Sequence, residues 1–368
     1  MVEWKKLGEV CSFNRGRTIT AKNAIKGEIP VIAGGQTPSY FHNESNRYGE
    51  SITVAGSGAY AGFVSYWNQP IFVSDAFTVD PTEKLIHKYL FYWLKKNQGM
   101  VFATQKGAGV PHVHGKDIAN FQIPIPSKPE QERIVKILDI FTDSIANLKA
   151  QIDARRKQYE YYRDQLLDLE GKKGVEMKTL GEVCEIRGRI GFRGYTRSDQ
   201  VCKGKGALTL TATNIVNQNI DYSNNTYIKW EKYYESPEIM VQNNDIIICQ
   251  RGSIGKLAII EKLNEPATIN PQLLLLKNIT CNSKYLIHYL KGAIFQKDLN
   301  KIVGVGTIQM IAQKDLKNIL IPLLNETEQS RIVGILDQFE AIIANLEAQL
   351  KAREKQYEYY RNKLLTFD

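Results

Sequence analysis

KQYEYYR occupies residues 157–163, and the same seven letters return at residues 355–361. At this offset of 198 the match spreads to residues 130–167 against 328–365, and 26 of these 38 residue pairs are identical. Two unrelated helices do not converge to this degree, so the chain contains an internal repeat. The fold therefore has to be explained as two copies of one unit.

Both copies carry apolar residues at alternating steps of four and three, which is the heptad pattern of a coiled coil. The first seam consists of Ile134, Leu138, Phe141, Ile145, Leu148, Ile152, Tyr159 and Tyr162. The second consists of Ile332, Leu336, Phe339, Ile343, Leu346, Leu350, Tyr357 and Tyr360. The seam tyrosines could stack on bases, but their positions favour packing between helices. Arg155 and Arg353 interrupt the two seams at equivalent places, where they either fix the register or extend their charges to solvent.

The ends of the two helices carry start and stop signals. Ser127 with Glu130, and Asn325 with Glu328, have the spacing of capping boxes. Glycines at positions 171 and 174 are expected to end the first helix. Each helix of about 40 residues would be roughly 60 Å long. The connectivity permits a parallel or an antiparallel pair, and the short link between residues 169 and 180 favours the antiparallel one.

The regions outside the helices are related to each other as well. LGEVC occurs at residues 7–11 and again at 180–184, and YLFYWLK at 89–95 is similar to YLIHYLK at 285–291. Between these anchors the two copies diverge, and the second copy is longer. A shared framework with different loops is therefore expected.

Local patterns in the first region predict mixed secondary structure. Short apolar runs at residues 30–33, 51–55 and 71–73 are separated by Gly, Asn and Ser, which indicates strands joined by turns. Apolar spacing over residues 84–96 predicts a helix.

The predicted fold is α+β. It has two similar mixed α/β globular domains separated by two long helices that form an antiparallel coiled coil, with pseudo-two-fold internal symmetry. The domain boundaries that we expect are 1–128, 129–172, 173–325 and 326–368.

The net charge of +9 is distributed unevenly. Residues 129–170 and 326–368 hold 13 basic and 17 acidic residues, which leaves 35 basic and 22 acidic residues elsewhere. The positive charge thus belongs to the globular regions and suggests a polyanionic partner. Five cysteines without a C-x-x-C pair indicate reduced thiols. Reduced thiols in turn predict a cytoplasmic protein. No secretory signal is visible and no apolar run is long enough to span a bilayer, so no membrane partner is expected.

Two similar basic domains on a rigid spacer would read two segments of double-stranded DNA in opposed orientation. Arg suits guanine edges and phosphates, Asn and Gln suit adenine, and small hydroxyls suit phosphates. The candidates in the first domain are Arg15, Arg17, Gln36, Thr37, Tyr40, Lys106, His112 and His114. Those in the second domain are Arg187, Arg189, Arg193, Arg197, Thr211, Thr213, Asn214, Arg251, Ser253 and Gln309.

The whole chain resembles the specificity subunit of type I restriction–modification systems. The motifs that carry the resemblance are the LGEVC openings, the E-Q-x-R-I-V entries at Glu130 and Glu328, and the paired KQYEYYR blocks. The second domain adds Arg251-Gly252-Ser253-Ile254-Gly255, similar to the family's Arg-Gly-x-x-Gly turn, whereas residues 54–58 of the first domain keep the glycines and lack the arginine.

The resemblance implies a subunit without a catalytic centre. Each target recognition domain would read one half of a bipartite, asymmetric DNA site, and the helices would set the spacer. Two methyltransferase subunits, which use S-adenosylmethionine to methylate adenine, would dock on the chain. A restriction subunit that uses ATP and Mg²⁺ is an optional further partner. No cofactor is expected on this chain itself.

Two stretches resemble catalytic or nucleotide-binding motifs, and both are incomplete. Residues 270–273, NPQL, begin like an adenine methyltransferase motif but lack its second proline and its aromatic residue. Residues 252–256 lack the spacing of a phosphate-binding P-loop. His112 and His114 have no Cys or acidic cluster nearby in sequence, so no metal site is predicted. The alternative function is a coiled-coil scaffold that binds other proteins and does not recognise DNA sequence.

Overall fold

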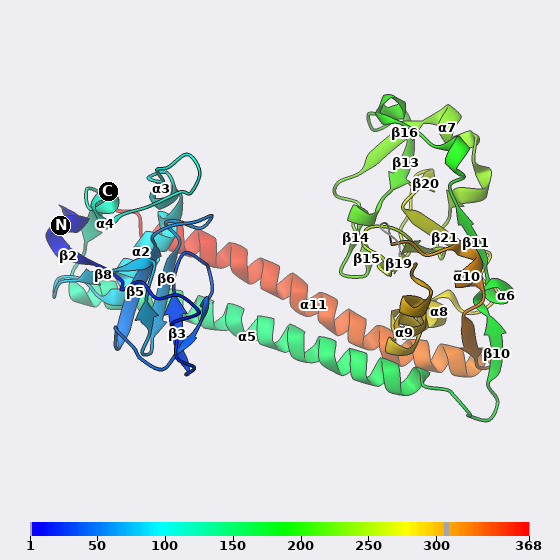
Figure 1. The fold of residues 1–368 in the computed structure, drawn as a ribbon, viewed down its shortest axis with the longest axis horizontal. Helices are drawn as coiled ribbons and strands as arrows, with labels where there is room; N and C mark the ends of the chain where they lie inside the picture. The colour runs from blue at the N-terminus through cyan, green and yellow to red at the C-terminus, as the bar shows by residue number, and fades with distance from the viewer. Residues whose placement is uncertain (1, 305–308, 368) are drawn as a thin grey trace. The chain divides into compact units, whose positions relative to one another are not determined.

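The structure is a computed structural model that describes residues 2–304 and 309–367. The chain divides into two compact units, Met1–Ala150 with Glu347–Asp368, and Gln151–Leu346. We call them unit 1 and unit 2. Each unit contains one mixed α/β module and one half of each long helix, α5 (Lys128–Leu167) and α11 (Glu326–Leu364), as Figure 1 shows. Residues 2–127 are module 1, and residues 168–325 are module 2.

Module 1 is built on an antiparallel sheet of four strands. The strands run in the order β2 (Cys11–Arg15), β8 (Ala76–Pro81), β5 (Glu50–Ala55) and β6 (Val64–Asn68). A second sheet contains β4 (Tyr40–His42), β3 (Ile29–Ile32) and β7 (Phe72–Val73). The centre of β5 is buried from Ser51 to Ala55, as its run of apolar and β-branched residues predicts.

Helices and an edge pair complete module 1. The helices are α1 (Leu7–Val10), α2 (His87–Lys96), α3 (Gln98–Phe102) and α4 (Gly115–Ile118), and β1 (Glu3–Lys6) pairs with β9 (Gln122–Ile125). Helix α2 buries Tyr89, Leu90 and Leu94 in the core that the sheet provides. The helix expected over residues 84–96 therefore exists, but it begins three residues later.

Module 2 repeats this plan with an insertion. Its four-stranded sheet has the order β11 (Glu185–Gly188), β21 (Leu273–Lys277), β18 (Ile246–Cys249) and β19 (Leu257–Ile259). A five-stranded sheet contains β12 (Gln200–Val201), β16 (Thr226–Lys229), β13 (Gly206–Leu210), β20 (Ala267–Ile269) and β17 (Met240–Val241). It replaces the three-stranded sheet of module 1, which explains the greater length of the second copy.

Apart from α7 (Trp230–Tyr234), the other α-helices and the edge pair of module 2 match those of module 1. They are β10 (Glu176–Thr179) paired with β22 (Leu320–Leu323), α6 (Leu180–Val183), α8 (Ser283–Lys291), α9 (Ala293–Ile302) and α10 (Gln313–Lys317). The short hairpin of β14 (Ile215–Val216) and β15 (Asn219–Ile220) lies in the insertion.

The two long helices pair in an antiparallel manner within each unit. In unit 1 the ring of Phe141 stacks on Tyr360 with centroids 5.3 Å apart, and Lys149 forms an ion pair with Glu354 at 3.1 Å. From the first contact to the second the residue number rises in α5 and falls in α11, so these two helix halves run in opposite directions. In unit 2 the ring of Tyr162 stacks on Phe339 at 5.5 Å.

The predicted seam residues range from buried to exposed. Those buried are Ile134, Leu138, Ile152, Tyr159, Ile332 and Leu336. Those half-buried are Phe141, Ile145, Leu148, Phe339, Ile343, Leu346, Leu350 and Tyr357. Tyr162 and Tyr360 are exposed, although each ring stacks on a phenylalanine of the other long helix.

The ends of the long helices agree only in part with the sequence signals. The side chain of Asn325 accepts a hydrogen bond from the backbone N–H of Glu328 at 2.9 Å, as the capping pattern predicts. Helix α5, however, ends at Leu167, before Gly171 and Gly174. Both glycines have positive φ, +70° and +78°, and so shape the turn that follows the helix.

The two seam arginines behave differently. The guanidinium of Arg155 donates to Gln158 of its own helix at 2.7 Å and is exposed. That of Arg353 donates to Gln356 at 3.0 Å and also lies 5.7 Å from the ring centroid of Phe141. Only Arg353 therefore contacts the opposing helix among the contacts of the described residues.

Candidate nucleic-acid interface

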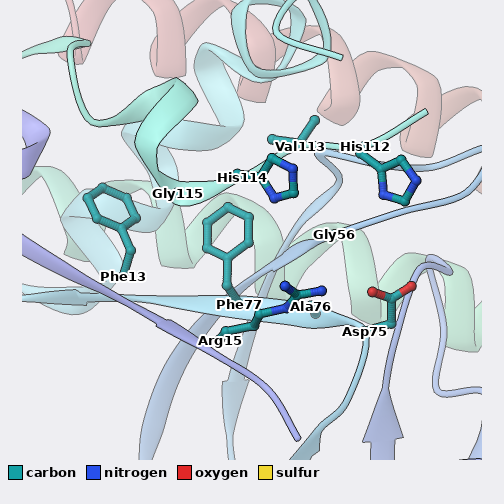
Figure 2. A pocket seen from close by; sticks show the side chains of 10 residues that line it. All are labelled: Phe13, Arg15, Gly56, Asp75, Ala76, Phe77, His112, Val113, His114 and Gly115. Atoms are coloured by element: carbon teal, nitrogen blue, oxygen red, sulfur yellow. The ribbon is translucent and has the colours of Figure 1, made fainter. Parts of the chain in front are cut away.

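Module 1 has a cleft where β2 ends and β8 begins, with a volume of about 140 Å³. We call it cleft 1. Figure 2 shows His112 and His114 on one side of it, facing Arg15, Asp75 and Phe77 on the other. The two imidazole rings are nearly parallel, with an interplanar angle of 9° and centroids 6.3 Å apart. Three predicted DNA contacts, Arg15, His112 and His114, thus line one feature.

Backbone hydrogen bonds fix the segments that line cleft 1. The N–H groups of Gly58 and Val113 donate to Pro111 and Gly56, both at 3.0 Å, which fixes the histidine segment on the turn after β5. Lys106 and His112 exchange two backbone bonds of 3.0 and 2.8 Å. A side chain at residue 34 would meet the carbonyl oxygen of Ser57 at 2.3 Å, so only glycine lets the 34–37 loop lie here. The exposed Gln36 and Thr37 belong to this loop.

The other candidates of module 1 differ in accessibility. The ammonium of Lys106 pairs with Asp117 and holds the pKa of that carboxyl below its usual range. Arg17 pairs with Glu44 at 3.3 Å and lies 5.1 Å from the ring centroid of Phe72, yet its side chain is largely exposed. The hydroxyl of Tyr40 donates to the carbonyl of Ile19 at 2.6 Å, so this group is engaged inside the module.

Module 2 repeats the backbone pairing that surrounds cleft 1, in which the turn after a central strand (residues 56–58 in module 1, 250–252 in module 2) pairs with a later segment (residues 111–113 and 310–311). We call this pairing the frame. Arg251 forms an isolated bridge with Met310, as Ser57 does with His112. The N–H of Ile311 donates to Gln250 at 3.0 Å, which matches the bond from Val113 to Gly56. The guanidinium of Arg251 contacts the Met310 sulfur at 2.9 Å and remains exposed.

Exposed polar residues accompany Arg251 at this frame. Ser253 lies on the same turn, and Gln309 precedes Met310. Gly188 leaves room for the side-chain amide of Gln313, because a Cβ at this position would lie 2.6 Å from the Gln313 nitrogen, and the amide nitrogen of Gln250 lies 3.9 Å from the same point. Gln250 and Gln313, which were not predicted from the sequence, therefore join the candidates.

Two predicted contacts are corrected by the structure. Arg189 is 7 % exposed, and its guanidinium donates to Thr268 at 3.1 Å and to the Ile269 carbonyl at 3.3 Å. Burial lowers the pKa of Arg189 from its ordinary value. Asn214 is buried too, and its amide joins the backbone of Thr211 to that of Asp221 at 2.9 and 3.0 Å. Both side chains support the module and do not face outward.

The remaining candidates of module 2 lie on its surface with local partners. Arg187 pairs with Glu185 at 2.7 Å, and Arg193 with Glu238 at 3.6 Å. Arg197 and Thr213 are exposed, and the Thr213 hydroxyl lies 2.7 Å from that of Thr211.

A second hollow, of about 780 Å³, opens beside Thr213. Asn217 and Gln218, both with positive φ, line it together with Lys256 and Lys291. Asn217, Gln218 and Lys256 were not predicted from the sequence, although a lysine after a glycine turn is a signal that could have pointed to Lys256. Lys291 is buried and pairs with Glu340 at 2.9 Å, so its ammonium group is engaged inside unit 2.

A polar cluster around the buried His288 in unit 2 is the only group of three or more potential metal ligands that the described residues form. It contains His288, Asp337 and Glu340. The ammonium groups of Lys284 and Lys291 pair with the two carboxylates at 2.8 and 2.9 Å. Because each carboxylate is already paired with a lysine ammonium group, the cluster is a structural hydrogen-bond and ion-pair network and does not fit a metal centre.

Comparisons with known proteins agree on one family. The family model described as type I restriction modification DNA specificity domain matches residues 1–155 and 172–353. The specificity subunit of the Escherichia coli type I restriction enzyme EcoR124I/EcoR124II is 29 % identical, over 100 % of this chain and 94 % of that protein. A putative specificity subunit from Haemophilus influenzae is also 29 % identical, over 100 % of this chain and 96 % of that protein.

The fold is shared with solved structures. The S subunit of a type I restriction–modification system from M. genitalium has a TM-score of 0.68 at 18 % identity, covering 100 % of this chain and 97 % of that one. No helix among the described residues is long and apolar enough to cross a membrane. Because the family model covers most of the sequence in two blocks, and the related proteins align over its full length, this chain belongs to the type I restriction–modification DNA specificity family.

Proposed function

We propose that this chain is the non-catalytic subunit that gives a type I restriction–modification complex its DNA sequence specificity. The observation that carries the proposal is one backbone frame built twice with different side chains. Module 1 presents Arg15 and two histidines at this frame, whereas module 2 presents Arg251 and glutamines. Two readers of this kind would recognise a bipartite site with two different halves.

The charge distribution supports contact with duplex DNA. The chain outside residues 129–170 and 326–368 carries 35 basic and 22 acidic residues. Neutralising phosphates releases counterions, so the affinity of the assembled complex for DNA should fall steeply with salt.

The long helices are proposed to set the spacer between the half-sites. Helices α5 and α11 are continuous, and each contributes one half to unit 1 and the other half to unit 2. A change in the length of both helices should therefore change the number of base pairs between the two halves.

The repeated tyrosines offer equivalent surfaces to two copies of one partner. Tyr161 and Tyr359 occupy the same place in the two repeats and are 62 % and 60 % exposed. Each contacts a neighbouring tyrosine, Tyr162 or Tyr360, edge to face at 5.3 Å. Exposed aromatic clusters are typical of protein interfaces. We assign these surfaces to two methyltransferase subunits.

Cofactors are assigned to the partner subunits. S-adenosylmethionine would be bound by the methyltransferase subunits, and ATP with Mg²⁺ by a restriction subunit where one joins. The complex is expected to work in the cytoplasm, where the thiols of the five cysteines would stay reduced.

The test is to reconstitute the chain with its methyltransferase partner and to map methylated adenines on random-sequence DNA. We expect a split motif with a fixed gap, and binding that weakens with salt. Methylation without sequence preference would overturn the proposal. DNA binding that is insensitive to the chain's presence would instead favour the protein-interaction scaffold.

A further inference from the structure

Asp75 is an acidic residue in a cleft whose other polar lining residues are Arg15, His112 and His114. It lies immediately before β8, and its backbone carbonyl accepts a hydrogen bond from Gly56 at 3.0 Å. The hydroxyl of Ser57 donates to one carboxylate oxygen, Oδ2, and so fixes the orientation of the group. Among the residues that the structure describes, the other oxygen, Oδ1, has no hydrogen-bond partner. A fixed carboxylate with one open acceptor therefore lines cleft 1.

A carboxylate is a poor neighbour for DNA phosphates, since like charges repel each other. It becomes favourable where it meets a hydrogen-bond donor on a base. In the major groove the exocyclic amino groups of cytosine and adenine are the donors. Adenine places the N7 acceptor beside its amino group, and an acceptor-only carboxylate would face that lone pair. Cytosine presents the N4 amino group alone, so cytosine fits Asp75 better.

The second module shows what occupies the same place in the other reader. The N–H of Gln250 donates to the carbonyl of Gln272 at 2.9 Å, as that of Gly56 does to Asp75. Gln272 directly precedes β21, as Asp75 precedes β8. The two residues are therefore equivalent in the frame. A glutamine amide offers one donor and one acceptor, which suits adenine.

We propose that Asp75 is a specificity-determining residue of module 1 that accepts a hydrogen bond from the N4 amino group of a cytosine in one half-site. The inference rests on the proposed function, because it requires that module 1 reads DNA. It goes beyond that function by naming one base contact. It also predicts that the two modules prefer different bases at this position, because one carries an aspartate and the other a glutamine.

The test uses the full chain in complex with its methyltransferase partner and maps methylation on random-sequence DNA. Asp75→Asn keeps the shape and provides both a donor and an acceptor, so adenine should replace cytosine at one position of one half-site. Asp75→Ala should reduce the preference at that position by roughly tenfold. Glu83→Gln is the matched control: it removes one negative charge at the opposite end of β8, where Glu83 is exposed, and should leave the motif unchanged.

The outcomes separate this inference from the proposed function. An unchanged motif with Asp75→Asn and Asp75→Ala would overturn the role of Asp75 and leave the function intact. A change in both half-sites, or loss of methylation at every sequence by variants that melt like the wild type, would overturn it as well. If the wild-type complex has no sequence preference, the proposed function fails first.

Discussion

Replacing Asp337 by Asn should destabilise unit 2 at neutral pH and have less effect in acid. Asp337 accepts a hydrogen bond from His288 at 3.1 Å and pairs with Lys284 at 2.8 Å. His288 is buried, and its other ring nitrogen lies 2.9 Å from the hydroxyl of Tyr159. This network joins α8 to the unit 2 halves of both long helices, so its loss should loosen that junction.

The magnitude follows from the carboxyl pKa. The hydrogen bond from His288, followed by the bond and charge of Lys284, lowers the pKa of Asp337 from 3.8 to about 2. One pKa unit corresponds to about 1.4 kcal/mol, which would give roughly 2.5 kcal/mol for the full shift. The Asp337 side chain is 33 % exposed, so solvent screening reduces the expected contribution to about 1–2 kcal/mol.

The sign of the pH dependence is set by the direction of the shift. A carboxyl whose pKa is depressed on folding stabilises the folded state above its unfolded pKa of 3.8. That contribution is lost as the pH falls toward about 2, where the folded-state carboxyl protonates. At about pH 3 roughly half of it should remain. Asp337→Asn should therefore differ from the wild type most at pH 7.

The assay is hydrogen–deuterium exchange of peptides from α8, expressed as protection factors so that intrinsic rates cancel. A loss of about 1–2 kcal/mol corresponds to a decrease of roughly 5- to 30-fold at pH 7. Glu160→Gln, which neutralises an exposed acid of α5, is the control and should change protection little. An Asp337→Asn effect that is as large at pH 3 as at pH 7 would refute the electrostatic reasoning.

Three further predictions concern DNA and partners. Removing one heptad from both long helices shortens each by about 10 Å, so methylation mapping should show a gap shorter by roughly three base pairs; an unchanged gap would end the spacer proposal. Arg251→Ala should weaken DNA binding of the complex and lower the slope of log affinity against log salt by about 1 if it contacts a phosphate, measured by titration at several salt concentrations; an unchanged affinity would remove it from the interface. The double variant Tyr161→Ala, Tyr359→Ala should weaken methyltransferase binding at least tenfold without changing the melting temperature of the free chain, because both rings are exposed; unaltered binding in ultracentrifugation would contradict the docking surfaces.

Helical features were predictable because they depend on local periodicity. The heptad spacing gave the two long helices and their pairing face, and the capping signal placed the start of α11 at Glu326. Helix ends were less certain, since Gly171 shapes the turn after Leu167 and does not terminate the helix itself.

The candidate interface was only partly predictable because it depends on contacts between distant residues. Asp75 enters cleft 1 through the antiparallel register that pairs Arg15 with Phe77. That register cannot be predicted from the residues next to Asp75 in the sequence. Arg189 lies two residues after Arg187 and shares its charge, yet only the fold shows that one is buried against Thr268 and the other exposed.

The internal repeat separates contacts that are duplicated in both modules from positions where the two modules carry different side chains. Gln131 and Gln329 are buried equivalents that accept backbone N–H bonds from Ile86 and Asn282 at 2.9 and 3.0 Å. Lys88 pairs with Asp139 at 2.7 Å as Lys284 pairs with Asp337 at 2.8 Å.

These duplicated contacts fasten each module to the helix halves of its own unit. The residues at the frame differ between the modules: Asp75 of module 1 corresponds to Gln272 of module 2, and Ser57 corresponds to Arg251. Exchanging these residues between the modules should therefore change the bases that each module reads. The attachment of each module to the helices should stay intact, since no duplicated contact is removed.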